Sequence, residues 1–117
     1  MVQGVLAMKS LDFGIRVVNC VKYLRDEKNE YVMSKQILRS GTSIGANIHE
    51  GLYAQSKPDF MSKLSISLKE ASETSYWLTL LNKTDYLSSK EYKSLKSDID
   101  ELIRMIIASL KTAKANE

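Results

Sequence analysis

Helical periodicity along almost the whole chain is the feature that most constrains its fold. Apolar residues recur every three or four positions, which is the spacing of one face of an α-helix. The single proline, Pro58, stands where a helix is expected to begin, and it therefore interrupts none of the periodic segments. These segments cover residues 8–28, 33–54, 57–82 and 89–113. Short links place such helices antiparallel, so the sequence predicts an all-α fold, an antiparallel up-and-down four-helix bundle.

Each predicted helix has an apolar face that we expect in one core. At 117 residues the chain is long enough for one such core and too short for two, so residues 1–117 are expected to form a single domain. Capping signals at Ser56 and Ser88 mark the starts of the third and fourth helices. The residues predicted to face the core are Phe13, Val17, Cys20, Val21 and Leu24; Ile37, Gly41, Ile44 and Ile48; Phe60, Leu64, Leu68, Ala71, Ser75 and Leu78; and Tyr92, Leu95, Ile99, Leu102, Ile106 and Ser109.

The scarcity of reactive side chains excludes most classes of enzyme. With one cysteine, Cys20, and one histidine, His49, the chain can form neither an internal disulfide nor a Cys/His zinc site. A Ser-His-Asp site would have to use His49, and no glycine-rich phosphate loop is present. We therefore expect no catalytic residues, no metal site and no cofactor. The chain also shows no signal peptide and no apolar run of about 20 residues, which predicts a cytoplasmic protein with no membrane partner.

Two of the predicted helices are apolar on a second side. A wide core or scattered surface residues would explain this pattern. The alternative is a protein interface, where tryptophan is enriched. We expect a homo-oligomer that uses the first and third helices. Its candidate interface residues are Leu11, Ile15 and Val18, beside Met8, and Ile66, Trp77 and Leu80.

The most specific stretch is QILRSGTSIGANIHEG at residues 36–51, followed by SKPDF at 56–60 and KEASETSYWL at 69–78. These segments resemble the signature of the four-helix bundle proteins named after the intervening sequences of 23S ribosomal RNA that encode some members. The resemblance implies a small bundle that assembles into a homopentameric ring and carries no catalytic activity. It also implies kinship with the accessory variability protein of diversity-generating retroelements, a basic pentamer that works with a reverse transcriptase and nucleic acid.

Polar residues of the second helix form a stripe beside its apolar face. Since unpaired polar groups at a core edge are destabilising, we expect a buried hydrogen-bonded network that fixes the helix register, with Arg39 as a partner of Glu70 or Glu73. The predicted members are Gln36, Arg39, Ser40, Ser43, Asn47, Glu50, Glu70 and Glu73. Alternatively, four of these residues, Asn47, Glu50, Glu70 and Glu73, could supply oxygen ligands to a metal or small molecule. The Glu-x-x-His pairs of bundle metal sites are missing, and His49 is expected to face solvent.

Two glycines, Gly41 and Gly45, lie one turn apart in the second helix. A glycine inside a helix costs about 1 kcal/mol relative to alanine. We expect close packing against a neighbouring helix to offset this cost.

The net charge of +3 comes from the first third of the chain, where residues 1–39 hold seven Lys or Arg and four Asp or Glu. The simplest interpretation is a solvated face of mixed charge. In a ring, however, any basic patch would be repeated in each subunit, so weak contacts with nucleic-acid phosphates would gain by avidity. The candidate nucleic-acid-binding residues are Lys22, Arg25, Lys35, Arg39, Lys57 and Lys63. The predicted function is a non-enzymatic oligomeric scaffold that binds RNA, DNA or a nucleic-acid enzyme such as a reverse transcriptase. The alternative is a protein-interaction adaptor with no nucleic-acid role.

Overall fold

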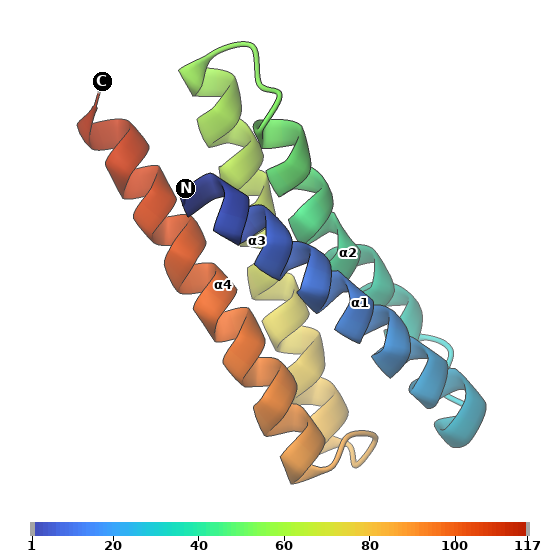
Figure 1. The fold of residues 1–117 in the computed structure, drawn as a ribbon. Helices are drawn as coiled ribbons and strands as arrows, with labels where there is room; N and C mark the ends of the chain where they lie inside the picture. Colours follow the sequence, from blue (N-terminus) through green and yellow to red (C-terminus); the bar gives the residue numbers. More distant parts are fainter. Residues whose placement is uncertain (1, 117) are drawn as a thin grey trace.

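The computed structural model describes residues 2–116, which form an elongated bundle of four helices (Figure 1). The helices are α1 (Val2–Lys28), α2 (Met33–Gly51), α3 (Lys57–Lys83) and α4 (Ser89–Ala115). Helices α1 and α3 each pack against α2 and α4, so α1 and α3 occupy opposite corners. Successive helices run in opposite directions, as predicted (Figure 1). Residues 1 and 117 of the predicted domain lie outside the described residues.

Two predicted helix ends are wrong. Helix α1 begins at Val2 rather than at residue 8, because Leu6 and Ala7 continue the buried face that includes Phe13. Helix α2 ends at Gly51 rather than at residue 54, and residues 52–56 form the turn to α3. The remaining helix ends lie within two residues of their predicted positions.

Side chains at the helix starts satisfy backbone amides that have no partner within the helix. The predicted capping box of α4 is complete, since the Glu91 amide donates to Ser88 Oγ at 3.1 Å and the Ser88 amide donates to Glu91 Oε1 at 2.9 Å. At α3, Ser56 Oγ accepts from the Asp59 amide at 3.2 Å, whereas the Asp59 carboxylate accepts from the Gln55 amide. The capping signals therefore locate both helix starts correctly.

Helix α2 is capped by Glu30, which lies in the link between α1 and α2. Glu30 is buried, and its carboxylate accepts the amides of Val32, Met33 and Ser34 at 2.7 to 3.1 Å. The preceding Asn29 has φ 52°, a left-handed conformation that asparagine tolerates, and it ends α1. A buried carboxylate thus fixes the turn between α1 and α2.

The core is largely the predicted one. The predicted faces of α2 and α4 are buried, except that Tyr92 is only half-buried. On α1, Phe13, Val17 and Val21 are buried, whereas Cys20 is half-buried. For α2 and α4, periodicity alone was therefore enough to predict which face is buried.

The core face of α3 is shifted from the predicted one. Leu64, Ala71 and Leu78 are buried as predicted, while Phe60, Leu68 and Ser75 are half-buried. The remaining buried positions are Ser67, Thr74 and Leu81. The two hydroxyl residues are accommodated because their polar atoms are hydrogen-bonded: Ser67 Oγ donates to the Ile44 carbonyl, and the hydroxyls of Thr74 and Ser40 bond to each other, both at 2.9 Å.

Helices α1 and α2 approach closely at the two glycines, as predicted. A Cβ atom at Gly41 would lie 2.8 Å from both methyl carbons of Val17. A Cβ atom at Gly45 would lie 3.3 Å from the carbonyl oxygen and Oγ of Ser10. The absence of a side chain at each position therefore allows the close packing that the glycine spacing predicted.

Candidate interaction surfaces

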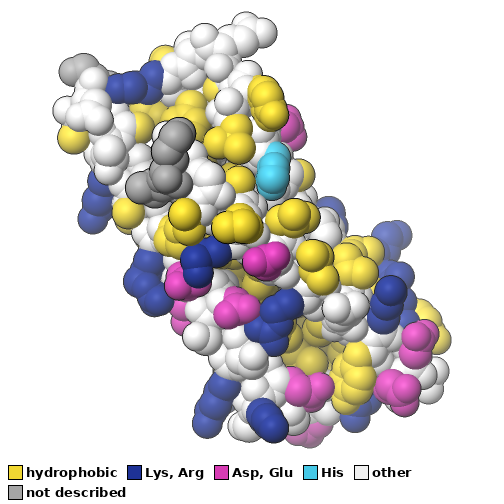
Figure 2. Space-filling view, viewed as in Figure 1, with side chains coloured by type: hydrophobic (Ala, Val, Ile, Leu, Met, Phe, Trp, Pro, Cys, Tyr) yellow, Lys and Arg dark blue, Asp and Glu magenta, His cyan; other side chains and the backbone are white. Residues whose placement is uncertain are grey.

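Helix α1 carries a row of exposed apolar side chains, which we call the α1 surface (Met8, Leu11, Ile15 and Val18). Met8, Leu11 and Ile15 are 60%, 55% and 53% exposed. Figure 2 views the molecule from the side of α1 and shows hydrophobic side chains gathered along this helix. Across residues 2–116, no helix has both the length and the apolar character to cross a membrane. The row is an exposed apolar face of the bundle.

A groove of about 650 Å³ runs beside the α1 surface, between α1 and α2. Leu11, Ile15 and Val18 line one side, and the small residues Gly45 and Ala46 line the other. Lys22 and the exposed His49 also border the groove. Small residues on α2 leave room for side chains of a partner helix, which is how amphipathic helices dock in apolar grooves.

The opposite side of α1 is closed by charged contacts with α4. Lys9 Nζ lies 3.0 Å from Glu101 Oε1, and Arg16 forms an ion pair of 2.6 Å with Asp98. The Arg16 guanidinium also donates to Ser94 Oγ at 2.8 Å. The apolar part of α1 is consequently open toward α2 and not toward α4.

Helix α3 carries a second apolar area, the α3 surface (Ile66, Tyr76, Trp77 and Leu80). Ile66 is 40% exposed, and Trp77 and Leu80 are half-buried. Tyr76, which is not among the predicted interface residues, is exposed and packs edge-to-face against Trp77 at 5.1 Å between ring centres. Its position next to the tryptophan was the available signal. Because Trp77 and Leu80 are half-buried, the side chains of the α3 surface are on the whole less exposed than those of the α1 surface.

Arg39 contacts both predicted glutamates, but this cluster is at the surface rather than in a buried network. Its guanidinium donates to Glu70 Oε2 at 3.0 Å and to Glu73 Oε2, and its side chain is 51% exposed. The Trp77 indole N–H also donates to Glu73, at 3.0 Å. This indole bond, followed by the bond from Arg39, lowers the pKa of Glu73, and the bond to Glu73 raises the pKa of Arg39.

The rest of the polar stripe does not form the predicted network. Ser40 is buried and bonded to α3, while Gln36 is half-buried. The Ser43 hydroxyl donates to the Arg39 carbonyl at 2.7 Å and the Asn47 amide to the Ser43 carbonyl at 2.8 Å. Both bonds stay within α2, because short polar side chains readily bond to the carbonyl one turn earlier. The stripe is therefore divided into separate contacts.

The four oxygen donors considered for a metal are divided among separate contacts. Glu70 and Glu73 face Arg39, whereas Glu50 pairs with Lys63 at 3.2 Å. The Asn47 side chain bonds within its own helix. Over the described part of the chain, no three His, Cys, Asp or Glu side chains are grouped to hold a metal ion. The geometry therefore does not favour the alternative of a carboxylate site.

The candidate nucleic-acid-binding residues are divided between the two ends of the bundle. Lys22, Arg25 and Lys35 belong to the end that holds the α1–α2 turn, and Lys57 and Lys63 to the opposite end. Arg25 Nε donates to Ser34 Oγ at 3.3 Å and Lys57 Nζ donates to the Asn116 carbonyl at 2.9 Å. With Arg39 paired to two glutamates, the six cations do not form a single patch on one subunit. Lys22 and Lys35 are exposed.

The single cysteine is a weak nucleophile. Burial, with a smaller contribution from nearby Glu91, raises the pKa of Cys20 to about 11. The thiol therefore stays protonated at neutral pH, where the thiolate is the reactive form.

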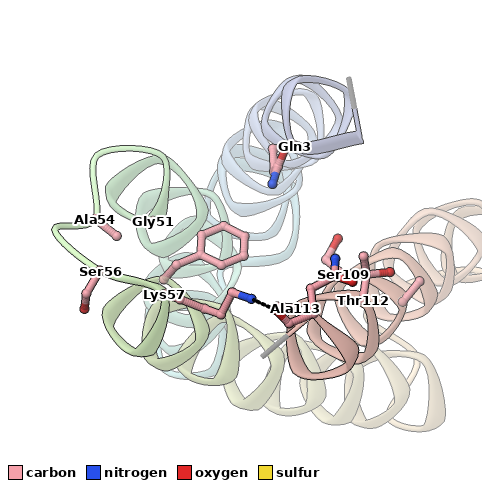
Figure 3. A pocket seen from close by; sticks show the side chains of 11 residues that line it. Gln3, Gly51, Ala54, Ser56, Lys57, Ser109, Thr112 and Ala113 are labelled. Carbon is pink, nitrogen blue, oxygen red and sulfur yellow. Dashed lines mark hydrogen bonds between the residues drawn. The ribbon is translucent and has the colours of Figure 1, made fainter.

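A second cavity, the end cavity, lies where the start of α1 and the end of α4 meet the α2–α3 turn (Figure 3), and the sequence did not predict it. Its volume is about 640 Å³, and Gly51, Phe60, Ala108, Ser109 and Ala113 line much of it. The small residues near the end of α4 were the available signal. This signal is weak because alanine and serine are common in helices.

A known protein family and a solved structure are similar to this chain. The family model described as 23S rRNA-intervening sequence protein matches residues 5–108. A crystal structure of a protein of unknown function from the S23 ribosomal protein family of Bacteroides thetaiotaomicron is similar, with a TM-score of 0.94 and 52% sequence identity. The match covers 95% of this chain and 99% of that chain. No curated protein matches this chain significantly. The four-helix arrangement is thus shared over nearly the full length of both chains.

Proposed function

The chain belongs to the 23S rRNA-intervening sequence protein family, and we propose that it is a non-enzymatic cytoplasmic scaffold that assembles from identical copies. The assembled form binds nucleic acid, either RNA or DNA, or a nucleic-acid enzyme such as a reverse transcriptase. The observation that carries the proposal is the presence of two separate apolar surfaces, on α1 and on α3.

The placement of these surfaces favours a ring. Helices α1 and α3 lie at opposite corners of the bundle, so their surfaces face different directions. If the α1 surface of one copy contacts the α3 surface of the next, the interface is head-to-tail, and such contacts close into a ring when the rotation allows it. A two-fold dimer would use one surface and leave the other uncovered. The family resemblance suggests five copies.

The shapes of the two surfaces support their pairing. The groove beside the α1 surface has small residues on one wall, and the α3 surface offers two adjacent aromatic side chains, Tyr76 and Trp77. Aromatic anchors seated in an apolar recess carry much of the binding energy in many protein interfaces. We therefore assign Trp77 and Tyr76 of one copy to the groove between α1 and α2 of its neighbour.

The charge distribution supports nucleic-acid binding at the bundle end that holds the α1–α2 turn. Near the middle, ion pairs such as Arg16 with Asp98 and Arg39 with Glu70 neutralise much of the charge. Lys22 and Lys35, near the α1–α2 turn, are exposed. A ring presents these lysines once per subunit, so weak phosphate contacts gain by avidity.

Native mass spectrometry at low salt, on protein purified without nuclease, tests assembly and nucleic-acid binding together. We expect a mass of several subunits, five if the family resemblance holds, with additional nucleic acid. A monomer at micromolar concentration would contradict the proposal. An oligomer without nucleic acid would leave assembly standing and count against the nucleic-acid role.

The salt dependence of binding tests the role of the lysines. The variant Lys22→Gln/Lys35→Gln should bind a labelled oligonucleotide more weakly, and the slope of log K against log salt should fall by about two for each subunit in contact with the strand. The matched control Lys69→Gln/Arg104→Gln removes the same charge from exposed positions nearer the middle of the bundle. Affinity that does not decrease as salt rises would exclude phosphate contacts.

The alternative function is a protein-interaction adaptor without a nucleic-acid role. The groove between α1 and α2 favours it, because an apolar groove of this volume accepts a partner helix. In that case, replacing Lys22, Arg25 and Lys35 together would leave partner binding intact. Adding Arg39 to this variant would be less informative, since Arg39 is already held by two glutamates.

A further inference from the structure

The end cavity has the volume and lining of a small-molecule site. Such sites have volumes of roughly 300–1,000 Å³ and are mostly apolar with a few polar groups. The apolar wall comes from Phe60 on α3, from Gly51 at the end of α2, and from Ala108 and Ala113 on α4. Together with Gln3 at the start of α1, these segments surround a space of about 640 Å³ that is open at the bundle end.

Lys57 supplies a positive charge at the rim. Figure 3 shows its side chain reaching from the start of α3 toward α4, where Nζ donates to the Asn116 carbonyl at 2.9 Å. An ammonium group has three N–H donors, so two remain for a bound group. Among the described residues that line the cavity, Lys57 alone is charged. The cavity therefore favours an anion.

Ser109 lines the cavity and carries an unpaired polar atom just beneath its wall. The residue is 9% exposed, and its Oγ is the one buried side-chain polar atom within residues 2–116 that has no hydrogen-bond partner. A buried hydroxyl without a partner is destabilising, which points to a partner supplied from outside the chain. Along α4, Ser109 lies roughly 10 Å inward from Asn116, where the Lys57 ammonium sits.

We propose that the end cavity binds a small aliphatic carboxylate whose chain carries a hydroxyl group near its far end. The carboxylate pairs with the Lys57 ammonium at the rim. The chain packs against Phe60 and Ala113, and its hydroxyl hydrogen-bonds to Ser109 Oγ once the Ser109 side chain rotates toward the cavity. This arrangement uses the charge, the apolar wall and the unpaired hydroxyl at the same time.

Isothermal titration calorimetry with ω-hydroxydecanoate and decanoate tests the site on the full chain. Ala113→Phe fills the cavity and should weaken binding of both acids by at least about tenfold. Ala115→Phe is the matched control, because Ala115 is exposed in the same last turn and does not line the cavity. Binding that survives Ala113→Phe would place the acids elsewhere, the α1 surface included, and would overturn the proposal.

Two further variants separate the polar contacts and are expected to fold normally. Ser109→Ala should remove the preference for ω-hydroxydecanoate over decanoate, which we expect to be several-fold in the unchanged protein. Lys57→Gln should weaken both acids about tenfold but not the neutral decanol, whereas Lys69→Gln, an exposed lysine outside the cavity, should change neither. The proposal fails if neither acid binds at millimolar concentration, or if Ser109→Ala leaves the preference unchanged.

Discussion

The hydroxyl groups of Ser40 on α2 and Thr74 on α3 are hydrogen-bonded at 2.9 Å, although both side chains are fully buried. Thr74 Oγ1 is also 2.8 Å from the Glu70 carbonyl, so the pair is tied to the α3 backbone. A polar contact of this kind in an otherwise apolar core has one favourable relative position of the two helices. It therefore fixes the register of α2 against α3.

Thr74→Val tests this contact, because valine keeps the shape of threonine and removes the hydroxyl. The Ser40 hydroxyl then stays buried without that partner, and we expect the free energy of unfolding to fall by about 1–3 kcal/mol. Urea denaturation measures this change. The double variant Ser40→Ala/Thr74→Val should lose less than the sum of the two single variants, since no unpaired hydroxyl remains. Strictly additive losses would show that the two hydroxyls do not interact.

Gly41→Ala should destabilise the bundle. The new Cβ atom would lie 2.8 Å from the methyl carbons of Val17, a buried β-branched residue that cannot rotate away easily. We expect a loss of about 1–3 kcal/mol, and a larger one for Gly41→Leu. Gly14→Ala is the control, because a Cβ atom there would have no neighbour within 4 Å. Alanine at residue 14 should raise stability by about 0.5–1 kcal/mol, so a similar effect at both glycines would contradict the argument.

The sequence predicted the core faces of α2 and α4 because their apolar and polar residues separate cleanly around the helix. The face of α3 was misplaced because Ser67, Thr74 and Ser75 all lie near its apolar stripe. Only their partners in three dimensions show that Ser67 and Thr74 are the buried ones. The start of α1 was missed although Leu6 continues the spacing of Phe13 and Val17. The capping role of Glu30 was not predicted either, because its three amide partners are positioned only when α2 forms.

The candidate surfaces were only partly predictable. Periodicity located the second apolar side of α1, which is exposed. The contact of Arg39 with Glu70 and Glu73 followed from their signature positions, yet its exposure depends on where α2 and α3 meet. The end cavity could not be derived from any local pattern, because it is formed by segments of all four helices.

Ile15→Glu should prevent assembly. Ile15 is 53% exposed at the centre of the α1 surface, and a carboxylate buried there without a partner would oppose association. We expect the dissociation constant to rise by at least about tenfold, measured by analytical ultracentrifugation over a concentration series. Ile107→Glu is the control, because Ile107 is 37% exposed on α4, outside both surfaces. If the α4 variant dissociates equally, the interface is not where we place it.

Lowering the pH should weaken the contact between α2 and α3 through Glu73. The hydrogen bond from the Trp77 indole, followed by that from Arg39, lowers the pKa of Glu73 below its ordinary value of 4.5. The stabilisation from this carboxylate is therefore fully present above pH 4.5, and it is lost as the pH falls through the lowered value in the folded state. Because the side chain is 35% exposed, we expect less than about 1 kcal/mol.

Glu73→Gln provides the measurement of this pH dependence. The variant should be less stable than the unchanged protein at neutral pH, and the difference in free energy of unfolding should shrink as the pH falls well below 4.5. Trp77→Phe removes the largest cause of the shift and should raise the pH at which the stabilisation is lost. Urea denaturation over a pH series tests both variants. A stability difference for Glu73→Gln that is constant with pH would show that the carboxylate charge does not contribute, and that the loss comes from packing of the side chain.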